Sequence, residues 1–401
     1  VCVAQFTRRM AAAGSLYSLT AKGLGPGAAF ACGWALLIGY AMLAMAALTA
    51  AGTYVRGALE RAGLSPGWVV PAAVTLLLGA VVAVCVVRGV RLSARVVLVT
   101  EAVSISLMLV VFALLLSRVG LQSPFVAPDR GLGGIAAGVL PALGAFIGFE
   151  AATSFGVEAR RPFQTVPRAM QWTAALCGVL YLVAAYTQSL GTRSLPGGLA
   201  AQSEPVAALA TAQHLPWLSY LLDIGIGASF FACAMTVSSA LARLLLSMGR
   251  ERILPRRLGA THPRFRTPHV AILSTVPAIA LAAAALVAFG ASPPRLFTTL
   301  LNVAGFGYLI AYLLVCVAAP VFLHRIGELT RGAVAAAAIA GTALLVTLAL
   351  FTTSTVDGGY PAVFGVLAAL GLAWYAWLRL RRPRRLAEIG IYDETTAEDI
   401  L

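Results

Sequence analysis

Charged residues are scarce in this 401-residue chain, and their scarcity limits what the protein can be. Asp, Glu, Lys and Arg together make up 11% of the sequence, whereas hydrophobic residues make up 60% and the mean hydropathy is +0.89. A soluble core cannot bury that much apolar side chain, and apolar runs of about 20 residues are typical of membrane-spanning helices. Long segments of alternating polarity, which a membrane barrel needs, are missing. The sequence therefore predicts an all-α integral membrane protein.

The motifs of several other protein classes are missing too. There is no HExxH sequence, no paired-Asp metal motif, no cluster of histidines, and no GxxxxGK[ST] loop of the kind that ATP-driven transport requires. The six cysteines are scattered without metal-ligand or redox spacing, and we interpret them as small apolar residues. A channel would need a repeated charged or carbonyl-lined filter. We therefore expect no enzyme activity, no metal and no other cofactor.

Apolar stretches recur along the chain and predict ten membrane spans. Gly- and Pro-containing connections at 64–68 and 194–198 separate two pairs of them. An even number of spans places both ends of the chain on one side of the membrane. The predicted spans cover residues 27–52, 67–87, 94–117, 133–155, 169–191, 215–245, 269–289, 298–323, 332–353 and 361–380.

Basic residues divide unequally between the two sets of loops, and this explains the net charge of +14 without a nucleic-acid partner. The stretches on one side hold 22 Lys and Arg residues, the opposite loops hold six, and Arg243 lies inside a span. Because Lys and Arg accumulate in cytoplasmic loops, we expect both ends of the chain to be cytoplasmic. We expect the protein to lie in the lipid bilayer of the cell membrane. The basic stretches are 8–22, 88–95, 160–168, 250–266, 325–331 and 379–385.

The two terminal segments of the chain differ in character. The first residues, VCVAQFTRRM, lack the basic-then-apolar order of a signal peptide and resemble the end of an apolar helix before a basic loop. We expect that the natural N-terminus lies further upstream. The last segment, residues 381–401, is first basic and then acidic, which is typical of a solvated tail with a membrane-surface anchor.

The stretch GAFIGFEAATSFGVEARRPFQTVPRAM (144–170) contains the main candidate site. Glu150 lies in a predicted span, and an ionisable residue there is costly and is a functional-site candidate. Pro141, Gly144 and Gly148 precede it and weaken the helix. A broken helix exposes backbone groups that are tolerated only inside protein or beside a cavity, where they can bind a small polar ligand. The alternative is a kinked helix whose Glu150 is satisfied by a neighbouring helix.

Two further groups of charges have open interpretations. Glu101, in VLVTEAVSIS, is the second acid inside a predicted span. It is either a proton carrier or a carboxylate near the inner interface that pairs with Arg91 or Arg95. Glu158 and Arg168, with the arginines between them, form either a solvated loop or an inner gate in which Glu158 pairs with an arginine of residues 250–266.

The segment FIGFEAATSFGVEARRPFQTVPRAM (146–170) resembles the sixth-helix signature of the amino acid–polyamine–organocation permeases. Residues 12–19 and 24–40 resemble that family's second loop and third helix, and residues 238–269 resemble its eighth helix and the following loop. The similarity covers essentially the whole chain. The matching residues of the signature are Phe146, Gly148, Phe149, Glu150, Glu158, Ala159, Pro162, Pro167, Arg168 and Ala169.

This resemblance implies a LeuT-type fold of five plus five inverted-repeat helices with two extra helices. It also implies a secondary transporter of amino acids or related small amines, such as polyamines. The ten spans would be the third to twelfth helices, residues 1–8 the end of the second, and the first would be absent. The permease domain would cover residues 1–380 and the tail 381–401. A membrane sensor with this fold, or a carrier of another solute, is the alternative, and coupling to H⁺ or Na⁺ stays open.

The resemblance also suggests roles for individual residues. Ala145, Phe146, Ile147 and Gly148 correspond to the unwound stretch whose backbone meets the substrate. Gly144 stands where several relatives have an aromatic gate. Tyr40 either lines the pocket or packs between helices. Ser104 stands where proton-coupled relatives often have a lysine. Weaker pocket candidates are Val237, Ser229 and Thr236 in the eighth-helix match and Asn302 and Tyr308 in the tenth.

Overall fold

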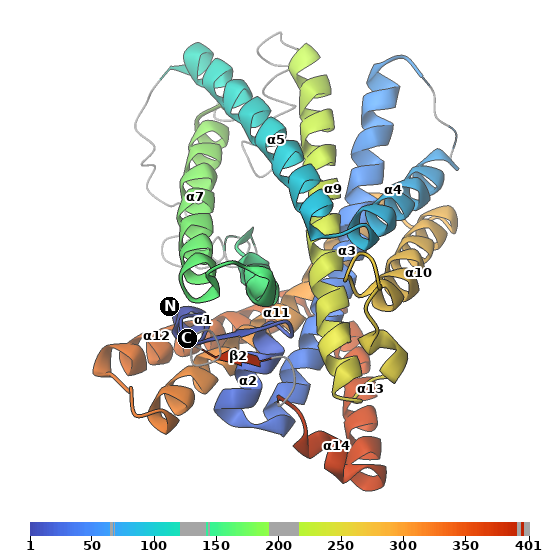
Figure 1. The fold of residues 1–401 in the computed structure, drawn as a ribbon. Coiled ribbons are helices and arrows are strands. Elements are labelled where there is room, and N and C mark those ends of the chain that lie inside the picture. Colours follow the sequence, from blue (N-terminus) through green and yellow to red (C-terminus); the bar gives the residue numbers. More distant parts are fainter. Residues whose placement is uncertain are drawn as a thin grey trace.

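Long helices dominate the computed structural model, which describes residues 1–64, 67, 69–120, 142, 145–191, 216–390 and 394–396. Within those residues nine helices are long and apolar enough to cross a membrane. They match nine of the ten predicted spans, and α3, α9 and α11 run further than predicted. The nine helices are α3 (Pro26–Arg61), α4 (Val70–Val87), α5 (Val90–Val119), α7 (Pro162–Gly191), α9 (Pro216–Arg250), α10 (His269–Ala288), α11 (Pro293–Arg325), α12 (Arg331–Thr355) and α13 (Tyr360–Arg381) (Figure 1).

The remaining predicted span, 133–155, differs from a regular helix. Residues 133–141, 143 and 144 lie outside the described part of the chain. The described part of this span ends in a 3₁₀-helix, η1 (Phe149–Glu158), that follows a turn at residues 146–148. A 3₁₀-helix is tighter than an α-helix and is usually short, so ten residues of it mark a segment that tertiary contacts hold in place.

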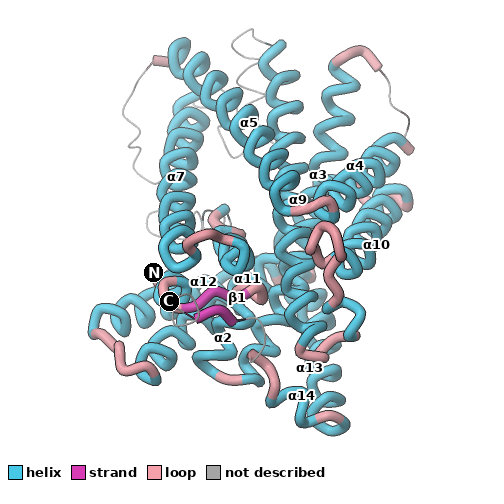
Figure 2. The backbone as a smooth tube through the Cα atoms, viewed as in Figure 1, coloured by secondary structure: helices cyan, strands magenta, loops and turns pink. Residues whose placement is uncertain are grey.

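Short elements lie near the two ends of the chain and, in the case of η4, in the loop after α9. They are α1 (Cys2–Thr7), β1 (Met10–Ala12), α2 (Leu16–Leu24), η4 (Arg256–Gly259), α14 (Pro383–Ala387) and β2 (Glu394–Thr396). Strand β1 pairs antiparallel with β2, with Met10 opposite Thr396 and Ala12 opposite Glu394, so the two terminal segments lie side by side (Figure 2). The predicted tail is therefore not solvated throughout, because part of it forms a strand against the N-terminal region.

Helix α3 lies at the centre of the bundle and packs along α9 and α11. In an apolar stretch of 18 residues of α3, 67% of the residues are buried, whereas the corresponding share is 6% in α7 and 11% in α12. Small residues allow the close approach. A Cβ on Gly307 would lie 2.3 Å from the Ala35 carbonyl oxygen, and a Cβ on Gly79 would lie 2.4 Å from Ala280 Cβ. Small residues at such contacts are typical of helices that pack inside a membrane.

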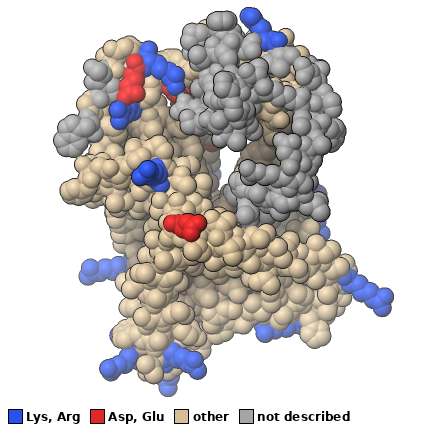
Figure 3. All heavy atoms as spheres, turned by 180° about the vertical axis from the view of Figure 1, so that it is seen from behind, with Lys and Arg blue, Asp and Glu red and all other residues tan. Residues whose placement is uncertain are grey.

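The outer surface suits lipid. Large apolar side chains point outward from the peripheral helices, including Trp172, Leu182 and Ile339, each more than 70% exposed. Viewed from behind, the Lys and Arg side chains gather mainly near the lower rim and the upper end, and the surface between them carries few charges (Figure 3). An apolar belt between two charged ends is the surface of a protein that spans a bilayer.

Candidate functional site

The predicted helix break is present in the described residues. Ala145 is the last helical residue before a turn at residues 146–148, and Gly148 has φ +106° and ψ −9°, a conformation that residues with a side chain rarely adopt. Helix α7 holds the upstream side of the turn. The Tyr181 hydroxyl donates to the Ala145 carbonyl oxygen at 2.6 Å, and the Phe146 ring meets the Tyr181 ring edge-on at 5.1 Å. Gly144 lies outside the described residues.

Glu150 is fully buried directly after this turn, and three donors satisfy its carboxylate. The Tyr40 hydroxyl of α3 donates to Oε1 at 3.2 Å, and the Gly148 N–H donates to Oε2 at 3.1 Å. The Tyr312 hydroxyl of α11 also donates to Oε2. A buried carboxylate is stable only with such partners. Neighbouring helices therefore satisfy Glu150, as the alternative interpretation of the sequence expected.

The hydrogen-bond network continues towards the N-terminal segment. Ser15 Oγ lies 3.4 Å from the Tyr40 hydroxyl and 2.8 Å from the Thr153 hydroxyl, and Thr153 donates to the Glu150 carbonyl oxygen at 2.7 Å. Four segments, which are the loop before α2, α3, η1 and α11, thus meet around one carboxylate. The sequence interpretation missed Ser15, Thr153 and Tyr312.

Three tyrosines lie close to Glu150, and Tyr308 is the one that does not bond to its carboxylate. The rings of Tyr40 and Tyr308 meet edge-on at 5.5 Å, and Tyr308 lies 6.1 Å from Tyr312 on the same helix. The Tyr308 hydroxyl is buried, and it has no hydrogen-bond partner in the described part of the chain. The spacing of four residues between Tyr308 and Tyr312 puts both on one helix face, which was the available signal for Tyr312.

An open cavity of about 900 Å³ lies further along α3, between α3, α9 and the start of α11. The ten residue steps from Tyr40 to Ala50, at the cavity's inner end, span about 15 Å of helix. At its outer end Arg61 Nε lies 2.5 Å from Asp223 Oδ2, and the Asp223 side chain is 6% exposed. Deeper in the cavity, Phe230 stacks on Tyr54 at 5.9 Å and meets Phe297 edge-on at 5.4 Å.

The two coupling candidates lie on α5. Glu101 is half-buried, and the Ser229 hydroxyl of α9 donates to both its carboxylate oxygens, at 3.0 and 3.1 Å. In the described part of the chain this bond takes the place of the ion pair with Arg91 or Arg95 that one of the two interpretations contained. Ser104 is buried, and its hydroxyl has no partner among the described residues. Two predicted candidates, Glu101 and Ser229, therefore meet.

The remaining candidates are dispersed. Val237 is buried in the core of α9, and Arg168 is exposed on α7. The side chain of Glu158 lies outside the described residues. A cation that contacts η1 is Arg243 of α9, whose guanidinium carbon lies 4.0 Å from the centre of the Phe155 ring. Arg243 is buried and donates to Ser239 Oγ at 2.8 Å. The sequence interpretation placed Arg243 inside a span without assigning it a contact.

A second buried carboxylate ties the two ends of the chain together. Glu251 is 1% exposed at the end of α9, and the Tyr17 hydroxyl of α2 donates to it. The Gly390 N–H donates to Glu251 Oε1 at 2.8 Å. Burial and the neighbouring Glu251 carboxylate raise the pKa of the Tyr17 phenol, so Tyr17 stays a neutral donor at physiological pH.

Acids, histidines and cysteines do not converge on a metal-binding cluster anywhere in the described residues. The polar groups that do converge are hydroxyls, backbone groups and single carboxylates. Such a set suits recognition of a small polar solute by hydrogen bonds.

Known proteins resemble the chain over most of its length. The family model described as "Amino acid permease" matches residues 1–375. The branched-chain amino acid permease BcaP of Bacillus subtilis is 26% identical over 294 residues, which are 67% of this chain and 60% of that protein. The methylthioribose transporter of Bacillus subtilis is 25% identical over 283 residues, with the same shares. The low-affinity putrescine importer PlaP of Escherichia coli is 26% identical over 307 residues, 72% of this chain and 66% of the importer. The chain thus spans about 60% of the length of the first two relatives.

Proposed function

This chain belongs to the amino acid permease family, and on that premise we propose that it is a secondary transporter of amino acids or related small amines. It would work by alternating access in a LeuT-type arrangement, within the cell membrane, with both ends of this chain cytoplasmic. The unequal distribution of Lys and Arg supports that orientation. The names of the relatives, which include a branched-chain amino acid permease and a putrescine importer, support the class of substrate.

The observation that carries the proposal is the turn at 146–148 beside a buried, fully partnered carboxylate. A turn inside a span leaves backbone groups that a regular helix would pair, and such groups bind substrate in transporters of this kind. We assign the backbone of Ala145, Phe146 and Ile147, and of Gly144 before them, to substrate binding. Because Glu150 is already bonded by three donors, we assign it to positioning the turn rather than to a direct contact.

The cavity between α3, α9 and α11 is the proposed entrance on the outer side. Its volume of about 900 Å³ has room for an amino acid with its water. The aromatic rings of Tyr54, Phe230 and Phe297 lie between the charged outer end and the tyrosine cluster around Tyr40. These rings would close the path when the site faces the cytoplasm, while Val237 would line the passage below them.

The gate and the coupling site complete the proposal. At the inner end, near Arg168, Glu158 would pair with an arginine of residues 250–266 in the outward-open state and exchange partners as the site opens inward. Such exposed pairs are worth only about 0–1 kcal/mol each, so exchange is cheap. Glu101, held by Ser229, would carry a proton, with Ser104 one turn further along α5. Na⁺ coupling is the competing mode. If uptake by Glu101→Gln keeps its pH dependence, Glu101 is not the proton carrier.

Counterflow in liposomes tests the transport function. Liposomes that contain the chain extended at its N-terminus by the upstream segment are loaded in turn with neutral, acidic and basic amino acids, with putrescine, and with methylthioribose, because one relative is named for that solute. We expect accumulation of one amino acid or amine class, which Glu150→Ala abolishes. Folded protein without counterflow for any amino acid or amine would overturn the proposal in favour of another solute or of a sensor.

A further inference from the structure

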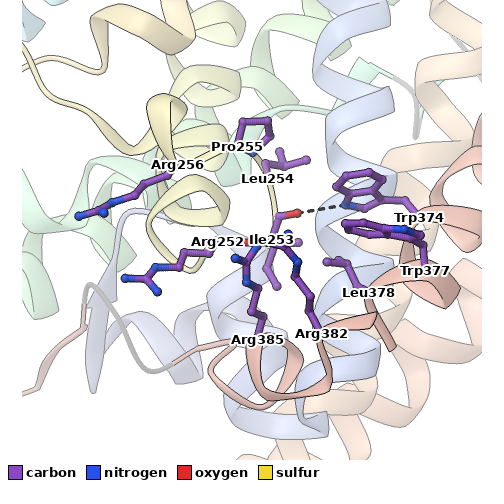
Figure 4. Close-up of a pocket in the computed structure, with 10 residues that line it drawn as sticks. All are labelled: Arg252, Ile253, Leu254, Pro255, Arg256, Trp374, Trp377, Leu378, Arg382 and Arg385. Carbon is purple, nitrogen blue, oxygen red and sulfur yellow. Dashed lines mark hydrogen bonds between the residues drawn. The ribbon is translucent and has the colours of Figure 1, made fainter. Parts of the chain in front are cut away.

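A second cavity, of about 450 Å³, lies at the opposite, basic end of the molecule. It is formed by the loop after α9 and by the junction of α13 with α14. Four arginines and two tryptophans are the residues that matter in its wall, namely Arg252, Arg256, Arg382, Arg385, Trp374 and Trp377 (Figure 4). The proposed transport function uses neither tryptophan and neither Arg382 nor Arg385. Arg252 and Arg256 belong to the 250–266 stretch that holds the proposed gate partner of Glu158.

The wall of this cavity carries an excess of positive charge. Four of the ten lining residues are arginines and none is acidic. In the described part of the chain none of the four forms an ion pair, and the one side-chain hydrogen bond among them runs from Arg385 Nη1 to the Arg252 carbonyl oxygen, at 3.3 Å. Partial desolvation and the charges of Arg382 and Arg252 lower the pKa of Arg385, and the Glu388 carboxylate of the next turn opposes this only in part. A bound anion would relieve this repulsion.

The arginines differ in direction. Arg382 and Arg385 run side by side towards the loop at Ile253, whereas Arg252 and Arg256 extend away from the tryptophans (Figure 4). Two guanidinium groups side by side present several N–H donors, and the planar fork of each one suits the oxygens of a phosphate. The other two arginines add to the positive potential around that position.

The tryptophans place the cavity at the level of lipid headgroups. Trp374 Nε1 donates to the Ile253 carbonyl oxygen at 3.0 Å. The Trp377 ring stacks on the Trp374 ring, with 4.9 Å between the ring centres, and the Arg382 guanidinium lies 5.6 Å from the centre of the Trp377 ring. Tryptophan side chains concentrate where the apolar core of a bilayer meets its headgroups. Both lie in the last two turns of α13, a helix apolar enough to span the membrane.

The loop side of the cavity is held rigidly. Arg252 has φ +59°, in the left-handed region that costs a non-glycine residue free energy. Backbone hydrogen bonds maintain it, from Arg252 N to the Gly249 carbonyl oxygen at 3.2 Å and from Ile253 N to the Met248 carbonyl oxygen at 2.9 Å. The Ile253 side chain is fully buried beneath the turn. The cavity therefore exists before any ligand arrives.

We propose that this cavity binds the phosphate of an anionic phospholipid headgroup, with Arg382 and Arg385 on the phosphate and Trp377 against the glycerol. A lipid fits better than free phosphate because the arginines lie next to an aromatic wall at membrane level, where acyl chains can remain in the bilayer. Basic pockets between transmembrane helices on the cytoplasmic side are suited to such headgroups. The bound lipid would tie α13 to the loop after α9.

Quenching of tryptophan fluorescence by brominated lipid tests this assignment. The purified chain is placed in phosphatidylcholine vesicles that contain either brominated phosphatidylglycerol or brominated phosphatidylcholine at equal mole fraction. We expect stronger quenching by brominated phosphatidylglycerol. Each arginine should raise the affinity for phosphatidylglycerol about fivefold. The variant with Arg382→Gln and Arg385→Gln should therefore lose the preference for phosphatidylglycerol almost completely.

A matched variant separates a site from general surface charge. Arg379→Gln with Arg381→Gln removes the same charge from the same helix end, but neither residue lines the cavity. The preference for phosphatidylglycerol should survive in this variant. If both double variants lose it equally, or if the Arg382 and Arg385 variant keeps it while its circular dichroism shows a folded protein, the proposed site is wrong.

Inorganic phosphate distinguishes the two sources of the ligand. In vesicles, millimolar inorganic phosphate should leave the quenching by brominated phosphatidylglycerol unchanged. Displacement of the lipid by inorganic phosphate at such concentrations would show that the arginines bind free phosphate and would overturn the assignment to a lipid. None of these readouts depends on transport, so failure of the proposed transport function would not affect them.

Discussion

Tyr312 donates a hydrogen bond to Glu150 across 162 positions of sequence. The same hydroxyl accepts a hydrogen bond from the Gly148 N–H at 3.1 Å. One side chain of α11 therefore contacts both the carboxylate and the turn beside it. Any movement of the turn relative to α11 must break these bonds or carry α11 along. This coupling gives the tyrosine cluster a larger role than packing between helices.

Removal of the Tyr312 hydroxyl should destabilise the protein. Tyr312→Phe leaves a fully buried carboxylate with one donor fewer, and a hydrogen bond to a charged group contributes about 1.5–3 kcal/mol. Tyr308→Phe is the matched control, because the Tyr308 hydroxyl has no partner in the described residues. We expect it to cost less than about 0.5 kcal/mol. Unfolding in mixed micelles with increasing denaturing detergent measures both, and equal losses would contradict the assignment.

A side chain at Gly148 should strain the turn. No atom lies within 4 Å of a Cβ added there, so the whole effect of Gly148→Ala arises from the backbone at φ +106°. The expected cost is about 1–3 kcal/mol of stability, together with reduced counterflow. Gly365→Ala, in α13, is the control. A Cβ there also meets nothing, but the glycine is helical, so alanine should stabilise by about 0.5–1 kcal/mol. A neutral Gly148→Ala would mean that the turn relaxes freely.

The ion pair between Arg61 and Asp223, at the mouth of the cavity between α3, α9 and α11, should contribute more to stability than the neighbouring pair between Arg56 and Glu60. Arg61→Gln removes the charged partner of Asp223, whose side chain is 6% exposed, and leaves that carboxylate underpartnered at a cost of about 1–3 kcal/mol. Arg56→Gln is the same change on the same helix. Its partner Glu60 is 47% exposed, so the loss should be about 0.5 kcal/mol or less. Thermal unfolding at low and high salt compares the two, and a larger effect at Arg56 would refute the expectation.

Deletion of residues 391–401 should expose the edge of β1. Strand β2 pairs with Met10, Ala11 and Ala12, so its removal frees backbone groups that it now bonds. We expect amide hydrogen exchange at residues 10–12 to become faster in the shortened chain. The Gly390 N–H bond to Glu251 remains, so exchange in the last turn of α9 should not change. Undiminished protection of residues 10–12 would show that other segments hold β1.

Much of the architecture could be predicted because it depends on local sequence. Apolar runs such as that of α10 predict a span wherever they occur, since each helix pairs its own backbone groups. Gly148 and Glu150 predicted the break for the same reason, because both act on the helix that contains them. The prediction was weaker where a partner was needed. For Glu101 one of two interpretations was an ion pair with Arg91 or Arg95, its neighbours in sequence, whereas the structure bonds it to Ser229 on another helix.

The sequence by itself determined the fold class, the spans and the position of the break, because hydropathy, helix-weakening residues and loop charges act within a segment or against the bilayer. Only the tertiary structure decided what satisfies the buried charges. Glu150 finds Tyr40 and Tyr312, and Glu251 finds Tyr17 and the Gly390 amide. Along the sequence these tyrosines look like ordinary core residues, and only packing brings their hydroxyls to a carboxylate. The free energy of such a bond depends on geometry between segments that are far apart in sequence, and no pattern along the chain encodes that geometry.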